Sequence, residues 1–223
     1  MSAYYNVSFT GQWLLSEIRN IGLSLQDLEA GLGGIKYFQA KFSGVSLNRL
    51  AGTNTNPAKA EDFSTIKIWD NLFSQAVDQV RFTIIHEFGH IWDARSMLGQ
   101  SIGLQIATRG NTEGFGCNTP AEVVMGGTCS YFPDPDMVSS YSRENRREDW
   151  ADSFATTLYR GNWSSLAGHP HGIDLNALTT AIDRVNYVSG QIQQFKNGVN
   201  AIEANLSHQG YPSYYDPGNT RIP

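Results

Sequence analysis

The segment His86-Glu87-Phe88-Gly89-His90 has the residue types and spacing of a metal-dependent hydrolytic site. Residues i and i+4 of a helix lie on one face, so His86 and His90 can present two imidazoles to one metal ion. Glu87 directly follows the first histidine, where its carboxylate can act as a general base on an attacking water. The pattern is typical of zinc hydrolases, and the alternative is a pair of surface histidines on an ordinary helix.

A catalytic zinc site needs three protein ligands and one open position, so a third ligand must come from elsewhere. The remaining histidines, His169, His171 and His208, do not follow the motif at the spacing of three-histidine zincins. We expect His169 and His171 to be exposed loop residues, and the alternative is that they touch the metal or the substrate. Glu148 and Asp152 are four residues apart in a helical run. Glu148 can bind the metal and Asp152 can accept the free ring N–H of a ligand histidine, whereas a solvated acidic face is the alternative.

These two segments resemble the gluzincin metallopeptidases, whose pattern is H-E-x-x-H followed by E-x-x-x-D. The resemblance is closer to the family of the anthrax lethal factor catalytic domain and the bacterial Pro-Pro endopeptidases. Residues 86–93 and 140–154 carry it. In that family a tyrosine precedes the third zinc ligand by seven residues, as Tyr141 precedes Glu148 here. Arg147 directly precedes the third ligand and differs from the family pattern.

The resemblance implies a zinc-dependent endopeptidase that acts on peptide or protein substrates, as a secreted protease or a toxin or effector domain. It implies one zinc ion per chain, bound by His86, His90 and Glu148. It further implies that Glu87 is the base and that Tyr141 stabilises the oxyanion. An inactive zincin-fold binding module is the alternative function, and a zincin that cleaves a single cellular partner is a third interpretation.

The motif requires a helix to display it, and the run from Ser74 to Ala94 has apolar residues at three- and four-residue steps. The segment before it, from Phe63 to Asp70, alternates like a half-buried strand. We expect an edge strand there that pairs with an extended substrate, or else an ordinary sheet strand. The residues of this predicted edge are Thr65, Ile66, Lys67 and Ile68.

The other segments are expected to support this site within one domain, residues 1–223. Residues 1–60 read as helical support, with 48–59 as a polar loop, and 61–94 contain the edge strand and motif helix. Residues 95–139 form a loop-rich insert in which Cys117 and Cys129 either form a disulfide or remain two free thiols. Residues 140–160 carry the third-ligand helix.

The C-terminal region, residues 172–206, has apolar residues about every 3.5 positions. This predicts one long helix, or two helices broken near Gly190, with Asp174 as the N-cap. We expect it to pack onto the domain of a monomer, although a coiled-coil dimer is also consistent with the spacing.

The fold class predicted from these elements is α+β. It is a zincin-type catalytic domain with a short mixed sheet, the active-site helix, a second ligand helix and a C-terminal helical region. Charged residues make up 17% of the chain and the formal net charge is -5, without a basic cluster, which argues against a nucleic-acid partner. No apolar run approaches the about 18 residues of a membrane span. The low charge and abundant Gly favour an exported protein, although residues 1–5 do not resemble a signal peptide.

Overall fold

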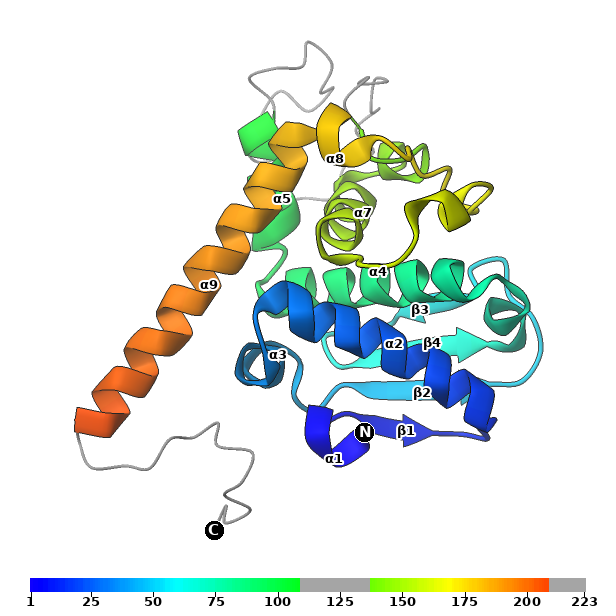
Figure 1. The fold of residues 1–223 in the computed structure, drawn as a ribbon, viewed down its shortest axis with the longest axis horizontal. Coiled ribbons are helices and arrows are strands. Elements are labelled where there is room, and N and C mark those ends of the chain that lie inside the picture. The colour runs from blue at the N-terminus through cyan, green and yellow to red at the C-terminus, as the bar shows by residue number, and fades with distance from the viewer. Residues whose placement is uncertain (109–136, 209–223) are drawn as a thin grey trace.

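A computed structural model describes residues 1–108 and 137–208. These residues form an α+β fold in which helices cover a four-stranded mixed sheet (Figure 1). The strands are β1 (Ser8–Thr10), β2 (Ser46–Leu50), β3 (Ala58–Ala60) and β4 (Thr65–Trp69). The sheet order is β1-β2-β4-β3, with β1, β2 and β4 parallel and β3 antiparallel to β4. The fold class predicted from the sequence is confirmed at the level of α+β.

The predicted substrate edge at Thr65, Ile66, Lys67 and Ile68 is wrong. These residues lie in β4, which pairs with β2 on one side and with β3 on the other. The edge strand on the β4 side of the sheet is β3, whose first two residues fall in the segment predicted as a polar loop. Three residues are too few for a period-two pattern to stand out from a loop, so β3 has no signature of its own.

Most of the helices lie on one face of the sheet and extend beyond it (Figure 1). They are α1 (Ser2–Tyr5), α2 (Leu15–Leu32), α3 (Ile35–Phe42), α4 (Val77–Arg95), α5 (Gly99–Thr108), α7 (Arg146–Leu158), α8 (Ala177–Thr180) and α9 (Ile182–His208). Short 3-10 turns follow β4 at η1 (Asp70–Ser74), precede α7 at η3 (Tyr141–Arg143) and follow it at η4 (Trp163–Leu166).

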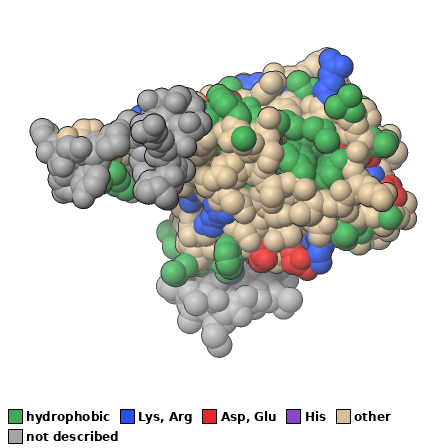
Figure 2. All heavy atoms as spheres, turned by 90° about the horizontal axis from the view of Figure 1, so that it is seen from below, with side chains coloured by type: hydrophobic (Ala, Val, Ile, Leu, Met, Phe, Trp, Pro, Cys, Tyr) green, Lys and Arg blue, Asp and Glu red, His purple; other side chains and the backbone are tan. Residues whose placement is uncertain are grey.

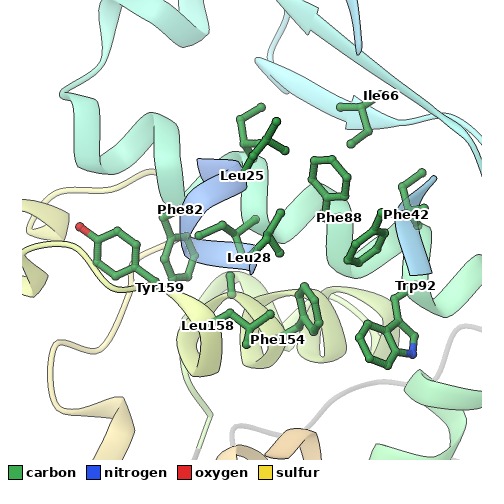
Figure 3. Close-up of a cluster of buried hydrophobic side chains, with 14 of the residues drawn as sticks. Leu25, Leu28, Phe42, Ile66, Phe82, Phe88, Trp92, Phe154, Leu158 and Tyr159 are labelled. Carbon is green, nitrogen blue, oxygen red and sulfur yellow. The ribbon is translucent and has the colours of Figure 1, made fainter. Parts of the chain in front are cut away.

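Helix α4 is the centre of the hydrophobic core. Every residue from 82 to 93 is buried, because the sheet and α2 lie against one side of the helix and α7 lies against another. Side chains from α2, α3, β4, α4 and α7 meet in one cluster (Figure 3). A helix that carries two histidines and a glutamate is therefore held rigidly, since close-packed interiors resist small displacements.

The N-terminal region has the helices expected from its apolar spacing, and it also supplies most of the sheet. Helix α2 ends at Gly33, whose φ of 92° is the left-handed conformation that glycine adopts readily. The expectation of helical support alone for residues 1–60 is incomplete, because β1, β2 and β3 all lie there. Likewise the insert at 95–139 begins with α5, and the proposed Cys117–Cys129 pair lies outside the described residues.

The C-terminal region packs onto the domain, as predicted. Val188, Ile192 and Val199 of α9 are buried, and Lys36 of α3 forms an ion pair of 2.9 Å with Glu203. Of the two alternatives predicted, one long helix is confirmed, since α9 is continuous from Ile182 to His208. A break near Gly190 is not found, and the chain leaves the helical conformation instead at Ala181, after α8. Gly190 costs roughly 1 kcal/mol relative to Ala, which is too little to interrupt a helix that is packed on its neighbours.

The described surface carries its positive charges in separate groups. On the face in Figure 2, Lys and Arg side chains lie apart from one another, and some of them adjoin Asp or Glu side chains. Among the described helices, none has the combination of length and apolar character needed to cross a bilayer.

Candidate metal centre

The crossing of α4 and α7 brings the two halves of the site together at Gly89. A Cβ added to Gly89 would lie 3.0 Å from the backbone Cα of Ala151, closer than a normal carbon contact. The indole N–H of Trp150 donates to the Gly89 carbonyl over 2.8 Å. The absence of a side chain at Gly89 therefore allows α7 to approach α4 closely at the motif.

Three potential ligand atoms converge where the helices cross. The Nε2 atoms of His86 and His90 are 3.0 Å apart, and Glu148 Oε2 is 3.1 Å from the first and 3.0 Å from the second. Ligand atoms about 2.0–2.1 Å from a tetrahedral metal lie roughly 3.3 Å from one another, which is close to this triangle. The three residues form one of two groups in the described chain whose geometry suits a metal ion.

Glu148 is placed by the first turn of α7. The side chain of Asn145 caps this helix by accepting hydrogen bonds from the backbone N–H groups of Arg147 and Glu148. Burial alone would raise the pKa of Glu148, but the hydrogen bonds from His86 and His90 outweigh it and hold the pKa well below its usual range. The carboxylate is thus ionised and available as a ligand.

Asp152, one turn further along α7, supports the first ligand. Its Oδ1 lies 2.6 Å from Nδ1 of His86, so the carboxylate can accept the ring proton and direct Nε2 toward the convergence point. Asp152 is fully buried, which alone would raise its pKa, but the adjacent imidazoles of His171 and His86 lower the pKa overall. Asp152 Oδ2 accepts a hydrogen bond from the Ser139 hydroxyl.

The expectation that His169 and His171 are exposed is wrong. His171 Nδ1 lies 2.9 Å from Asp152 Oδ1, which places His86, Asp152 and His171 in the second group suited to a metal. His169 is 3% exposed, and its Nε2 pairs with the Thr83 hydroxyl over 3.1 Å. Their burial and their partners could not be predicted from the sequence, because a loop contributes both histidines through long-range contacts that leave no periodic pattern.

The loop that contains His171 also fixes the position of Tyr141. The backbone N–H of Tyr141 donates to the His171 carbonyl over 3.1 Å, and the two rings stack at 4.3 Å between centroids. Burial raises the pKa of Tyr141, and neighbouring carboxylates raise it further, so the phenol keeps its proton and can act as a donor.

Glu87 faces the sheet edge from the next position on α4. Its Oε2 accepts a hydrogen bond from the backbone N–H of Ala60 in β3 over 2.6 Å. A cavity of about 350 Å³ opens between β3, α4 and the start of α7. Besides the three candidate ligands, its lining includes Ala58, Ala60, Glu87, Tyr141, Arg147 and His171.

Neither the protein-family models nor the curated proteins include a match to this chain.

Proposed function

We propose that this protein is a zinc-dependent endopeptidase of the gluzincin type. The observation that carries the proposal is the convergence of His86, His90 and Glu148 in a cavity that also contains Glu87. Two imidazole nitrogens and one carboxylate oxygen are a donor set that suits zinc, and they leave a fourth position for water or substrate. Zinc, when bound, lowers the pKa of a coordinated water toward about 7 and polarises a carbonyl.

The protein side chains then have distinct roles. Glu87 takes a proton from the attacking water and transfers it to the leaving amine. Tyr141 lines the same cavity and donates a hydrogen bond to the oxygen on which negative charge develops. Asp152 keeps His86 in the tautomer that presents Nε2 as a ligand.

The substrate is an extended peptide that lies along β3. This strand is the free edge of the sheet on the cavity side, and Ala58 and Ala60 both line the cavity. Addition of a strand to an exposed edge uses backbone hydrogen bonds and tolerates many side chains. Arg147 at the rim adds a positive charge that disfavours a basic side chain beside it.

The test is digestion of a peptide library with the purified protein in added zinc and in a chelator, together with metal analysis. We expect about one zinc per chain and zinc-dependent internal cleavage. A protein that remains metal-free after zinc addition at neutral pH would contradict the metal assignment. A zinc-loaded protein that cleaves nothing would favour the alternative, a binding module on this scaffold.

A further inference from the structure

The free edge of β3 presents the backbone of two alanines to the cavity. The backbone N–H of Glu61 donates to the Thr65 carbonyl, and the backbone N–H of Trp69 donates to the Pro57 carbonyl, each over 2.9 Å. In an antiparallel pair the residues that bond the neighbouring strand alternate with residues that face away. Positions 57, 59 and 61 therefore bond β4, and the N–H and C=O groups of Ala58 and Ala60 point to the free edge.

One of these outward groups is already engaged. The Ala60 N–H donates to Glu87 Oε2, the one hydrogen bond that the Glu87 carboxylate makes within residues 1–108 and 137–208. Glu87 is 5% exposed, and a hydrogen bond to an ionised carboxylate is stronger than one between neutral groups. The carboxylate is thus fixed at one oxygen, which leaves Oε1 to accept a proton.

We propose that the Ala60 N–H is a positioning group for the base Glu87. Because this N–H already donates to Glu87, it cannot donate to a substrate strand, and the backbone hydrogen bonds between β3 and the substrate end at Ala60. An extended peptide then pairs with the N–H and C=O of Ala58, and its backbone leaves the edge at Ala60, beside the base. This inference rests on the proposed endopeptidase function for its kinetic consequence, but the contact itself exists without substrate or metal.

The contact can be measured in the metal-free protein by NMR. We expect the Ala60 amide proton to resonate downfield and to exchange slowly with solvent in the wild type. In Glu87→Ala the signal should move upfield and exchange at least about 10-fold faster, whereas Glu87→Gln, which retains an acceptor oxygen, should preserve most of the protection. An Ala60 amide that is identical in wild type and Glu87→Ala would overturn the inference.

Two proline substitutions separate the role of Ala60 from that of Ala58. Neither N–H bonds β4, and proline is tolerated at edge positions that do not donate to the ladder. Ala60→Pro should lower kcat by roughly 10- to 100-fold with KM changed less than about 2-fold, because the base loses its orientation. Ala58→Pro should mainly raise KM, because it removes a donor used to bind the substrate.

Two further variants control for steric effects. Ala60→Gly keeps the N–H and should lower kcat far less than Ala60→Pro does, whereas replacement of Ala60 by lactate removes the N–H without adding a ring and should reproduce the loss. A lactate variant with wild-type kcat would contradict the inference. If the zinc-loaded wild type itself is inactive, the proposed function fails, while the NMR measurement still decides whether Ala60 holds Glu87.

Discussion

At the scale of single residues, the proposed mechanism separates metal binding from proton transfer. His86, His90 and Glu148 converge on one point, while Glu87 is held at the strand edge by Ala60. Glu87→Gln should therefore retain about one zinc per chain and lose nearly all cleavage, because the amide cannot accept the proton. Metal analysis and steady-state kinetics on the same preparation test this. Near wild-type turnover in the variant would place the base elsewhere.

The phenol of Tyr141 is the proposed oxyanion donor. His169 is buried beside Thr83 and does not line the cavity, so it is not an alternative donor. Tyr141→Phe should lower kcat by about 10²-fold and leave zinc content unchanged, because the oxyanion exists only in the transition state. Tyr187→Phe is the matched control, since Tyr187 is also partly buried but does not line the cavity. If Tyr141→Phe is fully active while His171→Asn is strongly impaired, the donor is the histidine.

Substitution of Asp152 is expected to lower the zinc affinity but not the zinc content at saturating zinc. Asp152→Asn should weaken zinc binding by roughly 10- to 100-fold, because the amide accepts the His86 ring proton less well than a carboxylate does. Competition with a chromophoric chelator measures the change. Asp78→Asn, which alters an ion pair with Arg81 outside the cavity, should have no effect on affinity. Equal affinities in Asp152→Asn and wild type would leave Asp152 with a purely structural role.

At the scale of elements, the position of α7 depends on the absence of a side chain at Gly89 of α4. A methyl group there meets the backbone at Ala151, which cannot rotate away as a side chain can. Gly89→Ala should destabilise the protein by roughly 1–3 kcal/mol despite its better helix propensity, and it should reduce zinc affinity by moving Glu148. Denaturant unfolding and zinc titration measure the two effects.

Gly190→Ala is the matched control for this substitution. Gly190 lies in a helix, in α9, and nothing lies within 4 Å of an added Cβ. The same change should therefore stabilise the protein by about 0.5–1 kcal/mol. A stabilising Gly89→Ala would show that the two helices can separate at no cost.

At the scale of the whole molecule, the buried histidine His169 makes stability depend on pH. Burial lowers the pKa of His169 to about 3, whereas an unfolded histidine titrates near 6.5. Between these values the unfolded chain binds more protons, so the free energy of unfolding falls as the pH falls below 6.5. From pH 7 to pH 5 the expected loss from this residue is about 2 kcal/mol.

The measurement is urea unfolding of the metal-free protein at both pH values, compared with His169→Gln. The variant retains a polar side chain beside Thr83 but cannot take up the proton. Its loss of stability between pH 7 and pH 5 should be smaller than that of the wild type by about 2 kcal/mol. The other titrating groups remain in both proteins and cancel in the comparison. Equal losses would show that His169 does not contribute.

The local sequence determined the parts of the site that depend on helical geometry. The four-residue spacing of His86 and His90, and that of Glu148 and Asp152, places each pair on one helix face. The apolar periodicity likewise predicted α4 and most of α9. In each case the contacts that define the element join residues a few positions apart, so they leave a regular pattern along the chain.

Tertiary structure alone decided which strand forms the edge, which loop residue supports the ligands and how closely the helices cross. Ala60 meets Glu87 and His171 meets Asp152 through contacts between separate elements. Neither β3 nor the loop around His171 has a periodic pattern of its own. Such pairings depend on how the sheet and helices stack, because the free energy that selects them comes from burying α4 on all sides rather than from local preference.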